Sequence, residues 1–256
     1  MPYSSRSYVN RYIPSNRFPV GLKWLLIANV SIFVFAFILR GSLDTYLIRT
    51  FALIPAEVTH PPFAAWRLFT YMFLHGSSIG LILWNMLALW MFGAPLERLW
   101  GTPRFLRFYF GCGIISAIAV ILFTSIFRGT DTVTVGSSAA VNAILVAYGL
   151  MFPDNTVLFG FLIPMKSKYM VMIIAAIVFL QSYLAASGGQ GSGIAIATLL
   201  LTGLAAGFLW LRGRRLQTQI REPLAAGYKE WKLRRAKRKF EVYLKKQDSN
   251  RDRWVH

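Results

Sequence analysis

Six stretches of apolar residues divide the chain, and polar or mixed segments separate them. The first covers residues 20–39, interrupted by few polar side chains. The others are residues 79–95, 108–127, 138–152, 169–186 and 193–211. A helix needs about 20 mostly apolar residues to cross a bilayer, and most of these stretches come close to that length. The pattern predicts an all-α fold, a bundle of six transmembrane helices.

The fourth stretch, residues 138–152, is shorter than its neighbours. At 1.5 Å per residue it covers about 22 Å of a hydrocarbon core that is roughly 30 Å thick. A helix of this length that begins below the membrane surface leaves a cavity above it, lined by protein or water. Ser138 is the first residue of this predicted helix.

The segments outside the six stretches define the predicted organisation. Residues 1–19 are polar, residues 20–211 hold the membrane domain, and residues 212–256 form a basic tail. We expect the first stretch to be a retained helix, because it is longer than the apolar region of a signal peptide and no small-residue cleavage site follows it. Residues 40–78 are mixed and aromatic, which is typical of a loop at the membrane interface.

Composition supports a membrane protein. Hydrophobic residues make up 55% of the 256 residues and charged residues only 15%, which leaves too little polar surface for a soluble protein. The single cysteine excludes a disulfide scaffold, and the aromatic and aliphatic content excludes a disordered chain. The sequence indicates no cofactor and no metal site.

The charge is unevenly placed. The tail holds 15 lysines and arginines and 5 acidic residues, a net charge of +10 out of +18 for the chain. By the positive-inside rule, both termini are expected to be cytoplasmic. Aromatic residues among the tail's charges favour contact with anionic lipid. A plain solvated tail is the alternative, and the tail lacks a folded nucleic-acid recognition motif, so nucleic acid is an unlikely partner.

Ser138 is the first candidate for chemistry. A serine at a helix N-terminus, two residues after Gly136, has free backbone N–H groups and a favourable dipole for a developing oxyanion. The alternative is structural, because serine is also a common N-cap residue. Spacing alone leaves both interpretations open.

Several motifs occur together in one order and resemble the bacterial rhomboid family of intramembrane serine proteases. The resemblance covers approximately residues 20–212. The matching motifs are the run Trp66-Arg67-Leu68-Phe69-Thr70-Tyr71-Met72-Phe73-Leu74-His75-Gly76, then Asn85-Met86, Gly93, Leu96-Glu97-Arg98-Leu99-Trp100-Gly101, Gly136-Ser137-Ser138-Ala139, the loop at residues 162–169, and Gly203-x-x-x-Gly207.

The resemblance implies a serine and histidine dyad, with Ser138 at the nucleophile position. The family's histidine lies three residues before the first glycine of the Gly-x-x-x-Gly pair, and that position is Leu200 here. Leucine cannot accept a proton, and serine needs an adjacent base to become a nucleophile. The second, fourth and sixth stretches hold no lysine or acidic residue, and the histidines are His60, His75 and His256. His75 matches a loop histidine of the family that we interpret as structural.

The oxyanion side of the site is also altered. Rhomboids pair an asparagine in the second span with a histidine four residues earlier; Asn85 matches the asparagine, while Leu81 stands at the histidine position. The interval from His75 to Asn85 is one residue longer than usual. Ala139 replaces the common glycine after the serine, and Asn142 replaces an aromatic residue. We therefore keep Ser138, Asn85 and His75 as the site residues, with the base missing at Leu200.

Other motifs indicate packing. Gly203 and Gly207 share one face of the last span and permit close helix contact, with Ala139, Ala140 and Ala143 as the expected facing surface. Trp66 and Arg67 are expected to anchor the first loop at the headgroup level. Glu97 and Arg98 are expected to mark the cytoplasmic end of the second span.

Two functions follow as hypotheses. The first is a rhomboid-like protein without catalytic activity that binds or scaffolds transmembrane helices of partner proteins. The second is an active intramembrane serine endopeptidase that uses Ser138 with an unrecognised base. A third possibility is a structural subunit of a larger membrane complex that docks through its tail.

Overall fold

The computed structural model describes residues 18–38, 42–60, 63–76, 78–126, 132–159, 163–187, 193 and 195–213. Most of the predicted segment 1–19 and of the basic tail 212–256 lies outside the described residues. The chain divides into two units, residues 1–208 and 209–256. The description below concerns the first unit, together with the helix that ends at residue 213.

Five helices within the described residues are long and apolar enough to cross a membrane. A further apolar helix, α7 at Ser138–Met151, has only 14 residues. The protein is therefore a membrane-embedded helical protein, and the sixth span stays a prediction. The five long helices are α1 at Val20–Ile38, α5 at Ile79–Trp100, α6 at Thr102–Ile126, α8 at Ser167–Ser187, and a last helix at Ala195–Gly213 that carries no label.

Two helix boundaries differ from the sequence prediction. The second span does not end at Pro95, because α5 continues to Trp100. A proline lacks only one backbone N–H, and packed neighbours let a membrane helix continue past it. Gly101 follows the last residue of the helix; its φ of +79° suits glycine, and its N–H donates to the Glu97 carbonyl at 2.8 Å. The third span begins at Thr102, earlier than the predicted residue 108, and Pro103 lies in the first turn, where proline is tolerated.

A short β-hairpin interrupts the predicted all-α architecture. Strand β1 at Thr156–Phe159 pairs antiparallel with β2 at Ile163–Lys166, and Val157 lies opposite Met165. The segment is too short to bury a face of its own, and no helical periodicity distinguishes it from a loop. The family resemblance predicted a loop at residues 162–169, where the structure has strand β2 and the start of α8 at Ser167.

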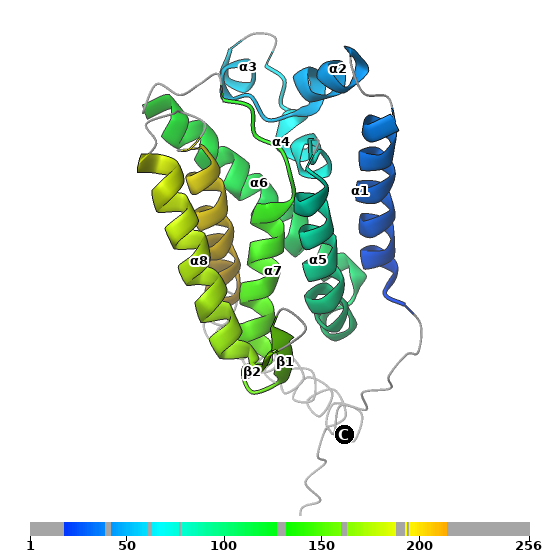
Figure 1. The fold of residues 1–256 in the computed structure, drawn as a ribbon, viewed down its shortest axis with the longest axis vertical. Helices are drawn as coiled ribbons and strands as arrows, with labels where there is room; N and C mark the ends of the chain where they lie inside the picture. The colour runs from blue at the N-terminus through cyan, green and yellow to red at the C-terminus, as the bar shows by residue number, and fades with distance from the viewer. Residues whose placement is uncertain are drawn as a thin grey trace, which may run out of the picture. The chain divides into compact units, whose positions relative to one another are not determined.

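Helix α7 is the centre of the fold. It contacts α5, α6 and α8, and every residue from Ala139 to Gly149 is buried. Figure 1 shows α7 in the middle, with α5 and α8 on either side of it. Because α7 is apolar and surrounded by helices, its few polar side chains face protein.

The glycines of the last helix allow it to lie directly on α7. A Cβ added at Gly203 would lie 2.7 Å from the Cα of Ala139, and one added at Gly207 would lie 2.8 Å from the Cα of Ala143. No side chain fits in that space. The expected close contact of this face is confirmed for Ala139 and Ala143.

The described part of the segment between α1 and α5 forms short helices that are not long enough to cross a membrane. They are α2 at Ser42–Phe51, α3 at Pro55–Thr59, α4 at Arg67–Thr70 and the 3₁₀ turn η1 at Tyr71–Phe73. Figure 1 shows α2, α3 and α4 together at the end of the helices opposite the hairpin.

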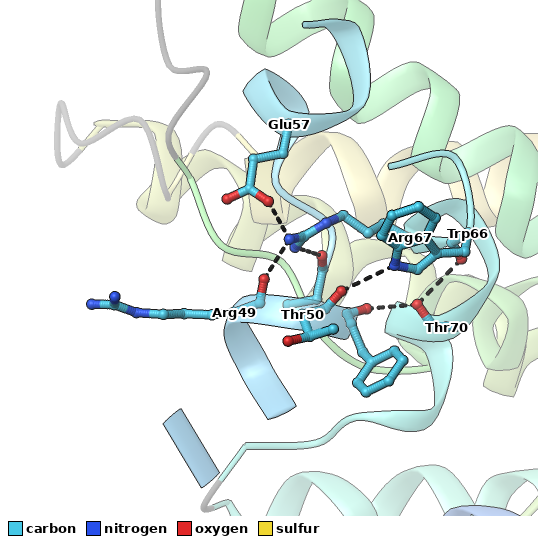
Figure 2. A network of polar contacts seen from close by, with 8 residues as sticks. Arg49, Thr50, Glu57, Trp66, Arg67 and Thr70 are labelled. Carbon is cyan, nitrogen blue, oxygen red and sulfur yellow. Dashed lines mark hydrogen bonds and ion pairs between the residues drawn. The ribbon is translucent and has the colours of Figure 1, made fainter. Parts of the chain in front are cut away.

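A network of side chains binds the end of α2 (Figure 2). A helix leaves its last carbonyls without intrahelical partners, and here four consecutive carbonyls, at residues 49–52, accept side-chain hydrogen bonds. Arg67 donates to Arg49 and to Ala52, the latter at 2.8 Å, while its guanidinium also pairs with Glu57. The other donors are Trp66 to Thr50 at 3.1 Å and Thr70 to Phe51 at 2.8 Å.

Arg67 corrects one expectation. Its side chain is only 4% exposed, so its guanidinium binds the carbonyl end of α2 and does not reach a lipid headgroup. Trp66 is half exposed, which suits an interfacial position. Trp66 and Arg67 therefore hold the loop mainly by donating hydrogen bonds to the backbone carbonyls at the end of α2.

Candidate functional site

Ser138 begins α7, as predicted. The chain reaches it through Gly136, whose φ of +106° is left-handed and suits glycine. Ser137 is the N-cap residue, but its side chain makes no capping hydrogen bond, and its carbonyl accepts the N–H of Val141 at 3.0 Å. The first N–H groups of α7 therefore have no side-chain cap, which leaves positive partial charge at this helix end.

Asn85 contacts the Ser138 hydroxyl. Its Nδ2 donates a hydrogen bond to Ser138 Oγ at 3.1 Å, and Asn85 is 2% exposed on α5. The structure thus brings together these two site residues, which lie 53 positions apart in the chain. A hydroxyl oxygen that accepts this bond still has its own hydrogen to donate.

His75 contacts Ser137, the residue before Ser138. Its Nε2 lies 3.3 Å from Ser137 Oγ, and its Nδ1 lies 3.4 Å from the Phe73 carbonyl. Because a carbonyl only accepts, Nδ1 carries the hydrogen, and in the neutral ring Nε2 accepts from the Ser137 hydroxyl. Burial lowers the pKa of His75 to about 4, against the opposing effect of the Phe73 carbonyl. The ring is therefore neutral at physiological pH.

The loop before Ser138 is attached to the segment between α1 and α5. The N–H of Leu53 donates to the Thr134 carbonyl at 3.0 Å, and the N–H of Thr134 donates back at 2.9 Å. The N–H of Gly136 donates to the Tyr71 carbonyl at 2.9 Å. Leu53 follows directly after the carbonyls that Arg67 binds, so the Arg67 network also fixes the approach to Ser138.

Leu200 lies on the last helix, one turn before the contact of Gly203 with Ala139. This places the predicted base position at the level of the start of α7. In the described part of the chain, no histidine, lysine or carboxylate hydrogen-bonds to Ser138 Oγ, whose partner there is Asn85. Those residues also contain no group of three His, Cys, Asp or Glu suited to hold a metal ion. Among the described residues, Ser138 Oγ therefore has a hydrogen-bond donor in Asn85 and no base in hydrogen-bond contact.

Glu97 has a structural role that sequence analysis missed. Its two carboxyl oxygens accept the N–H groups of Gly21 and Leu22 at 2.8 and 2.7 Å, and one of them also accepts Thr102 Oγ1 at 2.6 Å. An acceptor at these positions caps the N-terminus of α1. Because Glu97 lies 76 residues from Gly21, no local capping pattern reveals the contact.

Asn142 and Ser182 are two further buried polar side chains. Asn142 lies one turn after Ser138 on α7 and is 8% exposed; Ser182 lies on α8 and is 2% exposed. Asn142 Nδ2 and Ser182 Oγ are buried atoms without a hydrogen-bond partner among the described residues. The sequence singled out Asn142 as a departure from a family pattern, while a lone serine in an apolar span carries no signal.

Comparison with known proteins identifies a domain. The model of the rhomboid domain family matches residues 62–213. The match includes α5, α6, α7, α8 and the last helix, together with Trp66, Arg67 and Thr70 and the region of Ser138.

Three curated proteins are similar over parts of the chain. "Putative rhomboid protease YdcA" of Bacillus subtilis (strain 168) is 34% identical over 119 residues, 46% of this chain. Rhomboid protease GluP of the same organism is 42% identical over 59 residues, 23% of this chain. Rhomboid-like protein 19 of Arabidopsis thaliana is 28% identical over 179 residues, 66% of this chain. The matched segments span 55%, 11% and 55% of these three relatives, so the chain covers about half the length of two of them.

Proposed function

The chain belongs to the rhomboid family, and from this premise we propose that it binds or scaffolds transmembrane helices of partner proteins without cleaving them. The observation that carries the proposal is the environment of Ser138. Its partner among the described residues is the Asn85 amide, which donates and cannot take the serine proton. A serine without a base is a poor nucleophile.

His75 does not supply the missing base in this arrangement. Its Nε2 faces the hydroxyl of Ser137, which is 1% exposed, while its Nδ1 faces a carbonyl. Both ring nitrogens therefore have partners other than Ser138. The base position, Leu200, carries a side chain without a titratable group.

The test is a reconstitution of the full chain in proteoliposomes with a fluorescent single-span reporter. We expect energy transfer between labelled protein and reporter, which reports binding, and no cleavage product. Ser138→Ala should bind equally well. Ser125→Ala, on the exposed part of α6, is the matched control. Cleavage by the wild-type chain that disappears in Ser138→Ala, and persists in Ser125→Ala, would overturn the proposal.

An active serine endopeptidase is the second candidate. It is favoured by the Asn85 contact with Ser138 Oγ, by the uncapped N-terminus of α7, and by the names of two relatives as rhomboid proteases. Leu200→His distinguishes the candidates. Activity gained only in this variant indicates that the base alone was lost; activity already present in the wild type supports the endopeptidase.

The surroundings that we propose follow from the family, with its bacterial relatives, and from the charge pattern. We place the chain in a bacterial inner membrane with both termini cytoplasmic, and the basic tail at 212–256 on anionic lipid. A structural subunit of a larger complex is the competing role. Copurification after mild detergent extraction separates the two, because one stoichiometric partner supports the subunit and a varied set of single-span proteins supports helix binding.

A further inference from the structure

Four exposed basic side chains surround the place where α1 begins, α5 ends and α6 begins. The three helices contact one another, and a Cβ added at Gly21 on α1 would lie only 2.8 Å from the side chain of Thr102 on α6. Glu97 on α5 accepts hydrogen bonds from both residues. Each basic residue lies within five positions of one of these three along the chain. We call them the basic rim: Lys23, Arg98, Arg104 and Arg107.

The basic rim lacks a neutralising carboxylate among the described residues. Glu97 is the only acidic residue of the three helices, residues 20–38 and 79–126. It is 3% exposed, and its carboxylate accepts from two backbone N–H groups and from the Thr102 hydroxyl inside the protein. In the part of the chain that the structure describes, no member of the rim forms an ion pair. The exposed charges of the rim therefore have no counter-charge there.

The dipoles of α1 and α6 add to the positive charge of the rim. Lys23 is among the first four residues of α1, and Arg104 lies in the first turn of α6, where the positive end of a helix dipole disfavours a cation. Arg107 follows Arg104 by three residues and lies on the same side of the helix. An anion from outside the chain would therefore lower the free energy of the rim.

The position of the rim indicates a lipid as the source of that anion. Each member lies near the end of a helix long enough to cross a membrane, which puts it at the level of the headgroups. Trp24, next to Lys23, is 63% exposed, and an exposed tryptophan is typical of the membrane–water interface. Ile27, about one turn deeper in α1, is 42% exposed and offers apolar surface to an acyl chain. A lipid uses both the charge and the apolar surface, whereas a soluble anion uses the charge alone.

We propose that the basic rim binds the phosphate group of an anionic phospholipid. Arg98 and Arg104 flank the Gly101 turn between α5 and α6, and a planar guanidinium suits bidentate contact with phosphate oxygens, so we assign the main contacts to these two. Lys23 and Arg107 add charge beside them. The site belongs to the membrane domain and is distinct in sequence from the basic tail. The inference goes beyond the proposed helix binding and does not depend on it.

The test is native mass spectrometry of the full chain in uncharged detergent, with phosphatidylglycerol or phosphatidylcholine of the same acyl chains. We expect the wild-type chain to bind phosphatidylglycerol more tightly. A double variant, Arg98→Gln with Arg104→Gln, should weaken this binding about 5-fold to 30-fold, because it removes two cations near the membrane surface. Both side chains are exposed, and unchanged melting temperatures in lipid-free detergent verify that the variant folds.

Lys166→Gln with Lys168→Gln is the matched control. Figure 1 shows the hairpin, which carries Lys166, at the same end of the helices as the start of α1. This pair removes the same charge, but both lysines already pair with Asp154, so binding should weaken no more than about 2-fold. Arg234→Gln with Arg235→Gln removes the same charge from the tail and should have a similarly small effect.

Three results would each overturn the inference. One is equal affinity of the wild-type chain for the two lipids. Another is a loss in either control as large as in the double variant of Arg98 and Arg104, because binding would then follow net charge alone. The third is displacement of phosphatidylglycerol by millimolar inorganic phosphate, which would assign the rim to a free anion. None of these results bears on helix binding, which the single-span reporter tests separately.

Discussion

The imidazole Nε2 of His75 lies 3.3 Å from the hydroxyl oxygen of Ser137, one residue before the serine that begins α7. This contact joins the segment after η1 to the entrance of the central helix. A serine hydroxyl at the N-cap position usually accepts a hydrogen bond from a backbone N–H of the first helical turn. The Ser137 hydroxyl contacts His75 and makes no such capping bond. The start of α7 thus keeps free donors, and His75 contributes to that by holding the Ser137 side chain.

Lowering the pH should destabilise the protein through His75. Its pKa is lowered from 6.5 to about 4 by burial. Between these values the unfolded chain binds a proton that the folded chain does not, so stability is full above pH 6.5 and is lost as the pH falls toward 4. The loss attributable to His75 is at most about 3 kcal/mol. Thermal unfolding in detergent, followed by helical circular dichroism between pH 7.5 and 4.5, measures it.

His75→Gln should flatten this pH dependence, because glutamine does not titrate. The control is His60→Gln, since His60 is exposed, and it should leave the slope in place. An equal slope in His75→Gln and the wild type would show that other groups cause the acid sensitivity.

Arg67→Ala should destabilise the fold by about 2–4 kcal/mol, because it leaves the carbonyls of Arg49 and Ala52 unsatisfied and Glu57 without its partner. Arg67→Lys should recover only part of this loss, since an ammonium cannot reproduce the planar fork of donors. Melting temperature in detergent is the measurement. The control is the exposed Arg107, which among the described residues hydrogen-bonds to its own helix at Pro103. A loss in Arg107→Ala as large as in Arg67→Ala would contradict the network's importance.

The sequence predicted the helices well because their apolar length is a local property. Each apolar stretch corresponds to a helix, and Ser138 begins α7 as expected. Boundaries were less predictable, since whether α5 continues past Pro95 depends on neighbours that the local pattern does not reveal. The hairpin was missed because four-residue strands have no distinguishing period.

The site was predictable where a family motif marked it and hidden where it depends on packing. Asn85 was named in advance, and it contacts Ser138. The pairing of His75 with Ser137 could not be derived from the sequence. Ser137 and Ser138 are adjacent serines, and only the backbone conformation at the start of α7 decides which of them faces His75.

Gly203→Ala should be strongly destabilising, although alanine is the better helix former. The added Cβ would lie 2.7 Å from the Cα of Ala139, a backbone atom that cannot move without shifting α7. We expect a loss of about 2–3 kcal/mol, typical of overpacking. Gly80→Ala, with nothing within 4 Å of its Cβ position, should be neutral or slightly stabilising. Similar melting temperatures for both variants would show that the last helix does not pack on α7 this closely.

Glu97→Gln tests whether the end of α5 caps α1. Both carboxyl oxygens of Glu97 accept backbone N–H groups, from Gly21 and Leu22. Glutamine keeps one acceptor and turns an N–H₂ donor toward the second N–H, so one bond is replaced by a clash of donors. At 3% exposure water cannot compensate, and we expect a loss of about 2–4 kcal/mol.

The measurement is hydrogen exchange of the α1 amides together with the melting temperature. Exchange should accelerate most at the first turn of α1, while a general loss of packing would accelerate α5 and α6 equally. Arg98→Gln is the neighbouring control, because Arg98 is exposed and its replacement should cost no more than about 0.5 kcal/mol. Unchanged protection at residues 21 and 22 in Glu97→Gln would mean that α1 does not depend on this cap, and that its attachment to α5 rests on packing such as that of Leu22 against Gly93.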